Sequence, residues 1–209
     1  MKKLALALAA APLGLAALAV PPAVAQSGTA SDLSAVQAHL RAVDSMTANF
    51  TQTDRSNQRL TGTMTLKRPG KIRFQYQKGV PMLIVSDGKA LTLIDYEVKQ
   101  VERWPITNSP LGILLNPNMD ISQYGKVIDT GDNRVVSVEV RDKKRPEYGT
   151  ITMVFIRDSS APAGLRLSGW VALDAQNKRT SIKLSNQKFN VPIASNAFAW
   201  TDPRPTKRR

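Results

Sequence analysis

The protein has 209 residues, of which 42% are apolar and 22% are charged, a composition typical of one globular domain. The sequence contains no cysteine and a single histidine, His39, which excludes disulfide scaffolds, iron–sulfur clusters, thiol catalysis and metal sites built on several cysteines or histidines. Lysine and arginine number 29 against 16 aspartates and glutamates, so the formal net charge is +13 and an anionic partner or surface is expected.

Residues 1–25 have the pattern of a secretory signal peptide. Two lysines precede an apolar stretch from Leu4 to Val20, and Ala23-Val24-Ala25 is a cleavage site of small residues. A membrane anchor is the alternative, but Pro12 and the cleavage site speak against it. Cleavage would leave one exported domain, residues 26–209. Since no later stretch approaches the roughly 20 apolar residues that span a bilayer, that domain is expected to be soluble.

An amphipathic helix is expected over residues 32–46, and Ser31 can cap its first turn. Four apolar residues form its stripe at spacings of three and four: Leu33, Val36, Leu40 and Val43. His39 lies beside this stripe. A partly exposed histidine is a simpler interpretation of it than a metal ligand.

From Ala48 onward, apolar and polar residues alternate as in β-strands with one buried face. Strands are expected there and at 59–67, 71–77, 82–85, 90–96, 98–104, 123–129, 133–141, 149–157, 164–174 and 178–189. Residues 105–118 interrupt the series with three prolines and an apolar run, Leu111 to Leu115. A short apolar helix within a loop is expected there.

The predicted fold is therefore mainly β, with one long antiparallel sheet of about ten strands and few helices. A sheet of this length tends to curl, and the two apolar helices are available to cover its concave side. The half-apolar strands outnumber these helices, so part of the concave face would be filled by something other than the chain's own side chains. A sandwich or a closed barrel with a filled core fits the same pattern.

The sequence contains no recognisable catalytic pattern, whether a nucleophile elbow, a phosphate-binding loop, a dinucleotide-binding loop or paired histidines. Several aspartates fall at strand ends or turns, where this residue commonly caps backbone amides: Asp87, Asp95, Asp129 and Asp174. We therefore expect no enzyme, no cofactor and no metal. An envelope hydrolase is the alternative outside this class.

The excess of basic residues would suit a nucleic acid, but the sequence favours another explanation. The basic runs Lys143-Lys144-Arg145 and Lys207-Arg208-Arg209 are short and lack interleaved aromatic residues. Export would also remove the usual nucleic-acid targets. A solvated surface in a cell envelope rich in anionic lipid is the simpler interpretation, and no nucleic-acid partner is expected.

The sequence resembles the periplasmic outer-membrane lipoprotein carriers, the LolA family, over nearly the whole exported chain. Seven segments follow in that family's order and spacing: Phe50-Thr51-Gln52, Gly62, Leu66-Lys67-Arg68-Pro69, Phe74, Val85-Ser86-Asp87-Gly88-Lys89, Val98-Lys99-Gln100-Val101 and Ser109-Pro110-Leu111-Gly112-Ile113-Leu114-Leu115. The part from Leu165 to Phe198 also resembles the family's last strands.

The resemblance implies a half-open, curled antiparallel β-barrel covered by an N-terminal helix and a short helical lid. Its cavity would take up the acyl chains of a lipoprotein in the periplasm. The implied partners of this monomeric carrier are an ATP-driven exporter in the inner membrane and a lipoprotein receptor at the outer membrane. Arg68, which alone suggests a strand-end arginine in solvent, would bond the lid backbone and keep the empty lid shut.

The lid is expected at 105–117, with four side chains facing inward: Leu111, Ile113, Leu114 and Leu115. The strands are expected to supply the lining of the acyl cavity: Ile72, Phe74, Met82, Ile84, Leu91, Leu93, Met153, Phe155, Leu165 and Trp170. Each of these residues is equally compatible with an ordinary hydrophobic core.

Three related functions compete with the carrier. The outer-membrane receptor would have a lipidated N-terminal cysteine, which this sequence lacks. A periplasmic sensor of lipidic stress signals has a similar fold but usually a second domain. A carrier of another amphiphile, such as a glycolipid, is not separated from a lipoprotein carrier by these residues.

Overall fold

The computed structural model describes residues 24–106, 111–142, 144, 146–174 and 176–205. Several predicted features lie partly or wholly outside the described residues: the signal peptide up to residue 23, lid residues 107–110, Lys143 and Arg145, and the last basic run. Among the described helices, none is long and apolar enough to cross a membrane.

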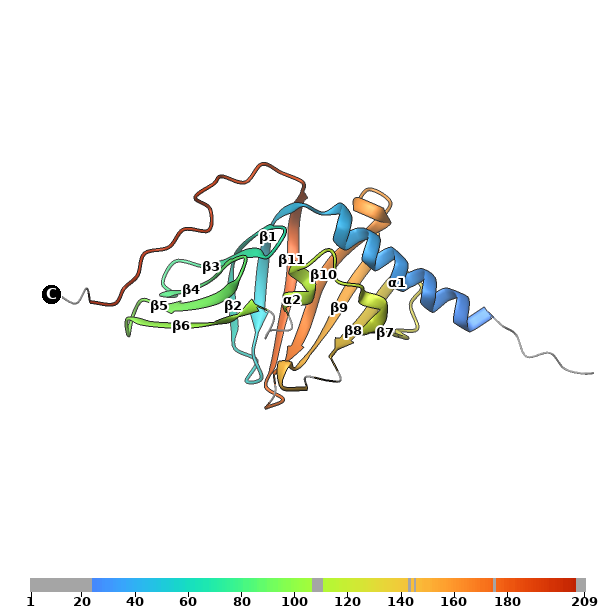
Figure 1. The fold of residues 1–209 in the computed structure, drawn as a ribbon, viewed down its shortest axis with the longest axis horizontal. Helices are drawn as coiled ribbons and strands as arrows, with labels where there is room; N and C mark the ends of the chain where they lie inside the picture. Colours follow the sequence, from blue (N-terminus) through green and yellow to red (C-terminus); the bar gives the residue numbers. More distant parts are fainter. Residues whose placement is uncertain (1–23, 107–110, 143, 145, 175, 206–209) are drawn as a thin grey trace, which may run out of the picture.

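The strands form one antiparallel sheet of eleven strands, which confirms the mainly β class and the expected long sheet of about ten strands (Figure 1). In chain order they are β1 (Ser45–Thr53), β2 (Arg59–Lys67), β3 (Lys71–Tyr76), β4 (Met82–Asp87), β5 (Ala90–Asp95), β6 (Gln100–Pro105), β7 (Gly125–Ile128), β8 (Val135–Arg141), β9 (Thr150–Arg157), β10 (Leu165–Leu173) and β11 (Arg179–Phe189). Their order across the sheet is β6-β5-β4-β3-β2-β1-β11-β10-β9-β8-β7. Two meanders are thus joined at the centre by the pairing of β1 with β11.

In the described part of the chain, five helical segments accompany the sheet: α1 (Val24–Ala42), α2 (Leu111–Leu115), η2 (Ile121–Gln123), η3 (Pro146–Tyr148) and η4 (Pro162–Gly164). Apolar residues of α1 and α2 belong to the same hydrophobic core as one face of the sheet. We call this the inner face and the opposite one the outer face. Two-residue alternation separates them: Met64 and Leu66 of β2 are buried, whereas Thr63 and Lys67 are exposed.

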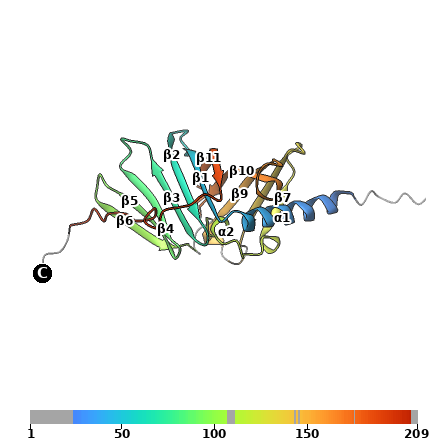
Figure 2. The same ribbon diagram turned by 90° about the horizontal axis from the view of Figure 1, so that it is seen from above.

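The sheet is strongly curled, as Figure 2 shows. Phe74 in β3 and Trp170 in β10 are four strand-to-strand steps apart, which would be about 19 Å across a flat sheet. The centroids of their rings are only 6.1 Å apart. The inner face is therefore concave, and the two halves of the sheet share one core.

The N-terminal helix differs from the prediction at both ends. The sequence predicts residues 32–46, whereas α1 begins at Val24 and ends at Ala42, so Ser31 lies within the helix and not at its cap. The end is set by tertiary contacts, because Asn190 donates to the carbonyl oxygen of Ala42 at 3.0 Å and accepts from the amide of Asp44 at 2.9 Å. Strand β1, paired on both sides, then begins at Ser45.

The segment after β11 crosses the outer face of the first meander (Figure 1). Phe198 and Trp200 pack there against a small cluster formed by Leu83, Val85 and Ile94. Arg73 of β3 donates to the carbonyl oxygen of Ala199 at 2.7 Å, which attaches the segment to the sheet. Side chains on both faces of β4 and β5 are thus shielded from water.

Gly62 in β2 leaves room for the ring of Phe50, which lies directly opposite it in β1. A Cβ at position 62 would come within 2.7 Å of that ring and 2.1 Å of the carbonyl oxygen of Gln75. Phe50 cannot move freely, because it makes edge contacts with Phe74 and Tyr76 at 5.2 and 5.3 Å between ring centroids.

We therefore predict that Gly62→Ala lowers the free energy of unfolding by about 1–3 kcal/mol, as overpacking of a filled core does. Denaturant unfolding measures the change. Thr63→Ala, at the neighbouring exposed position, is the control and should change stability by less than about 0.5 kcal/mol. Equal stability of Gly62→Ala and the original protein would show that the core yields at this position.

Candidate functional site

The candidate site is the part of the inner face that lies under α2. Leu114 and Leu115 of this short helix are 0% and 1% exposed and belong to the main core, while Leu111 and Ile113 are half-buried against it. All four predicted lid residues therefore contact the core in this structure. Since α2 contains only five residues, its own hydrogen bonds are few and its position depends on its neighbours.

Arg68 is the neighbour that reaches furthest into this site. It follows β2 directly, is only 7% exposed, and donates from Nε and Nη2 to the carbonyl oxygen of Leu114 at 3.1 and 3.0 Å. Its Nη1 donates to the carbonyl oxygen of Val43, just after α1. One guanidinium thus connects the lid, the end of the N-terminal helix and the turn after β2. The solvent-exposed strand-end arginine, the other interpretation of the sequence, is wrong.

The charge of Arg68 persists although the side chain is buried. Burial lowers its pKa to about 10, and the nearby carboxylate of Asp44 acts in the opposite direction. Because this pKa remains well above neutral pH, the guanidinium stays protonated and donates as a cation. Hydrogen bonds from a charged donor contribute about 1.5–3 kcal/mol, so this contact is strong for a five-residue helix.

Two tight turns next to Arg68, one at Gly70 and one at Gly88, also hold α2 in place. The amide of Gly70 donates to the carbonyl oxygen of Leu115 at 3.0 Å, a second bond between this turn and the lid. The buried hydroxyl of Ser86 donates to the carbonyl oxygen of Gly70 at 2.7 Å. Gly70 has a φ of +77°, and a Cβ there would lie 2.7 Å from the Cα of Gly88. Only glycine suits this close approach.

His39 is another buried polar residue near the site, and here the sequence-based expectation of partial exposure is wrong. It is 2% exposed because the stripe of α1 is wider than predicted and includes position 39 between Val36 and Leu40. Its Nδ1–H donates to the carbonyl oxygen of Pro162 at 2.9 Å. Its ring packs edge-on against Phe155 and Phe189, with centroids 5.4 and 6.0 Å apart.

Burial lowers the pKa of His39 below its usual 6.5, more than the hydrogen bond to Pro162 raises it. The positive charge of Arg68 acts in the same direction as burial. The imidazole is therefore neutral at pH 7. Within the described ranges, no group of three or more histidine, cysteine or acidic side chains could hold a metal ion.

The residues predicted to line an acyl cavity fall into two groups. Seven are buried in the same core as the lid: Ile72, Phe74, Leu91, Met153, Phe155, Leu165 and Trp170. Three are only half-buried: Met82, Ile84 and Leu93. The structure thus brings the buried seven together with Leu114 and Leu115. A role in binding acyl chains stays a prediction for all ten.

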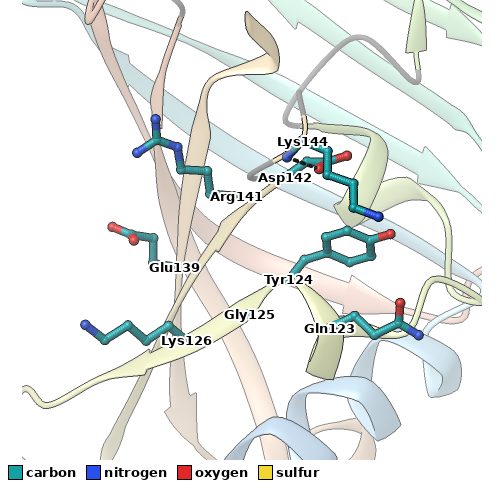
Figure 3. A pocket seen from close by; sticks show the side chains of 8 residues that line it. All are labelled: Gln123, Tyr124, Gly125, Lys126, Glu139, Arg141, Asp142 and Lys144. Carbon is teal, nitrogen blue, oxygen red and sulfur yellow. Dashed lines mark hydrogen bonds between the residues drawn. The ribbon is translucent and has the colours of Figure 1, made fainter. Parts of the chain in front are cut away.

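A separate cleft of about 1030 Å³ lies beside β7 and β8, at the far edge of the sheet. Polar and charged residues line it: Gln123, Tyr124, Gly125, Lys126, Glu139, Arg141, Asp142 and Lys144. Figure 3 shows Lys126, Glu139 and Arg141 on one side of the two strands and Tyr124 and Lys144 on the other. The charges are of both signs and do not converge, so this cleft does not have the chemistry of the predicted acyl site.

Sequence reasoning missed several residues of the site: His39, Val43, Gly70 and Ser86. A signal existed for two of them, because Gly70 follows a proline in a turn and Ser86 precedes the Asp-Gly turn of a hairpin. Val43 contributes only its backbone carbonyl, which no side-chain pattern reveals.

A family model described as "Outer membrane lipoprotein carrier protein LolA" matches residues 41–201. An outer-membrane lipoprotein carrier protein of Legionella pneumophila is 27% identical over 181 residues, covering 81% of this chain and 85% of the relative. Another, from Neisseria meningitidis, is 28% identical over 200 residues and covers 92% of both. A solved LolA superfamily protein of Nitrosomonas europaea is 11% identical, covers 82% of this chain and 97% of its own, and has a TM-score of 0.46.

The buried His39 generates a prediction about stability and pH. Because its pKa is lowered in the folded protein, the unfolded chain binds the proton first as the pH falls below 6.5. The stabilisation is fully present above about pH 6.5 and is lost towards the folded pKa.

Denaturant unfolding at about pH 7.5 and about pH 5.5, above the range where most carboxylates titrate, measures this loss. His39→Gln keeps a donor for Pro162 but does not titrate. The original protein should lose more stability between the two pH values than this variant. An equal loss in both proteins would exclude His39 as its source.

Proposed function

The chain belongs to the LolA family of outer membrane lipoprotein carrier proteins, and on this premise we propose that it binds lipoprotein acyl chains under the lid and carries them through the periplasm. The observation that supports this proposal most directly is the joint burial of Leu114 and Leu115 with the predicted lining of the concave face. In this closed state, lid side chains occupy the apolar surface that acyl chains would cover.

The need for such a protein follows from the chemistry of its cargo. Each acyl CH₂ group exposed to water costs about 0.8 kcal/mol, so a lipid anchor with several long chains does not cross an aqueous space unprotected. A concave apolar face with a displaceable cover removes these chains from water. Once the cargo has left, the lid covers part of this face again.

The lid opens, on this proposal, by separation of α2 from Arg68. Opening breaks the two hydrogen bonds to Leu114 and the bond from Gly70 to Leu115. It also exposes two leucines, each of which gains about 1.5–3 kcal/mol from burial. The incoming acyl chains offset this loss by covering the face that the leucines leave. An empty carrier therefore stays closed, and a loaded one stays open without an external energy source.

The inner face also suits chains of differing length. Met64 and Met153 are fully buried in it, and Met82 is half-buried at its edge. Methionine side chains are unbranched and polarisable, so they adapt their shape to irregular gaps. We expect this adaptability to let one protein accept lipoproteins with different acyl chains.

The remaining parts of the proposal come from the sequence and the family. Residues 1–25 act as a cleaved signal peptide and residues 26–209 form one monomeric carrier domain. The proposed partners are an ATP-driven lipoprotein exporter in the inner membrane and a lipoprotein receptor at the outer membrane. The family is one of carriers, and we propose neither a catalytic site nor a cofactor for this chain.

Mass spectrometry of ligands that copurify with the protein from the native periplasm tests the proposed cargo. We expect diacylated or triacylated lipoproteins. Free glycolipids alone would instead identify a carrier of another amphiphile. The ligands that copurify with the double variant Leu114→Asp, Leu115→Asp provide a comparison with those of the original protein. Two charges on the lid cannot be buried in the empty state, so this variant should lose the closed form.

Arg68→Leu should loosen the lid without unfolding the sheet. Two amides report on α2: Gly70, which donates to Leu115, and Asn116, which donates to the carbonyl oxygen of Gly112 at 3.0 Å. Loss of a charged donor worth about 1.5–3 kcal/mol predicts that hydrogen exchange at both amides becomes about 10- to 150-fold faster. Uptake of a fluorescent acyl probe should accelerate as well, while thermal unfolding stays cooperative.

Arg134→Leu is the matched control, since Arg134 is an exposed arginine that forms an ion pair with Asp132. It should leave exchange at both amides unchanged. The assignment of Arg68 to the lid fails if its variant exchanges these amides and takes up the probe at the original rates.

A further inference from the structure

The outer face of the sheet has an unusual charge distribution at its centre. Four adjacent strands, β3, β2, β1 and β11, contain no aspartate or glutamate (Figure 1). They contain seven basic residues: Arg59, Lys67, Lys71, Arg73, Arg179, Lys183 and Lys188. We call these residues the outer basic face, since they alternate with inward-facing apolar residues and all but Arg73 are exposed.

The arrangement of these residues is not explained by folding alone. Lys67 lies directly opposite Lys71 in the register of β2 and β3, and like charges in such pairs destabilise a sheet. Within the described residues, none of the seven forms an ion pair with an acidic side chain. Three nearby acids have other partners. Asp54 and Asp174 accept from backbone amides of their own turns. Asp87, which lies opposite Lys71 in the register of β3 and β4, accepts from the amides of Lys89 and Ala90 and forms an ion pair with Arg103.

The side chains between the cations are small and polar. Thr51 lies opposite Lys183 and Thr47 opposite Lys188, and the outward residues of β2 between Arg59 and Lys67 are threonines. Protein–protein interfaces usually have an apolar or aromatic centre with few lysines. The large exposed hydrophobic residues of the described chain, Tyr96 and Val98, lie elsewhere, at the turn between β5 and β6. Two aromatic side chains on this side of the sheet, Phe198 and Trp200, pack on β4 and β5 at the border of the face, and Nζ of Lys71 lies 5.9 Å from the centroid of the Phe198 ring. Over β2, β1 and β11, the face therefore lacks the anchors of a protein-docking site.

We propose that the outer basic face binds the surface of anionic phospholipid bilayers. A layer of phosphate groups needs no matching shape, and a broad cationic surface with hydroxyl groups between its charges complements it. Contact through this face leaves α2 on the opposite side of the sheet, so the lid remains accessible while the protein is at the membrane. The proposal concerns a surface separate from the lid and holds whatever cargo the inner face carries.

Sedimentation with protein-free vesicles tests this binding. Vesicles that contain phosphatidylglycerol should bind the protein at low salt and release it as ionic strength rises, whereas phosphatidylcholine vesicles should not bind it. The triple variant Lys67→Gln, Lys183→Gln, Lys188→Gln should bind on the order of a hundredfold more weakly, because each lysine near an anionic surface strengthens binding about fivefold.

A matched triple variant, Lys78→Gln, Lys99→Gln, Lys178→Gln, removes the same charge from exposed turns outside this face. It should keep most of the binding. The proposal is overturned if both triple variants lose binding equally, because net charge alone would then be responsible. It is also overturned if the protein binds native membranes but not protein-free vesicles, which would assign the face to an acidic membrane protein.

Discussion

The guanidinium of Arg68 lies where α2, the end of α1 and the turn after β2 meet, and it donates to the backbone carbonyl oxygens of Leu114 and Val43. A backbone carbonyl offers hydrogen bonds without a full negative charge, so the contact is strong but separable. A buried carboxylate partner would make separation far more costly, because two unpaired charges would remain. The choice of acceptor thus suits the opening and closing proposed for α2.

The curl of the sheet determines which surface α2 covers when Arg68 holds it in place. Because Phe74 and Trp170 approach each other from different halves, the inner face encloses a single apolar space instead of two separate packing surfaces. Leu114 and Leu115 enter that space from α2, whose backbone is bonded to Arg68 and Gly70. The proposed movement of this one short helix would therefore change the exposure of the core that the two halves of the sheet share.

Local sequence patterns predicted the strands well but not their partners. The alternation at 59–67 defines β2 to the residue, because burial on one face of a sheet requires that period. No local sequence pattern indicates that β1 pairs with β11. The end of α1 depends on Asn190 from the other end of the chain, and the burial of His39 depends on Pro162. The contact of Arg68 with the lid could be predicted only from the family resemblance, since the acceptor is the backbone carbonyl oxygen of Leu114, which no side-chain pattern reveals.

The central pairing of β1 with β11 has a consequence for how the chain is made. Thr53 and Ser181 are partners although 128 residues separate them, whereas the other strand pairs join neighbours in sequence. Each meander can assemble from local hairpins, but the two cannot unite until the last strand is available. The sheet of a chain that emerges from its N-terminus would consequently stay in two unjoined parts until almost the entire length was available.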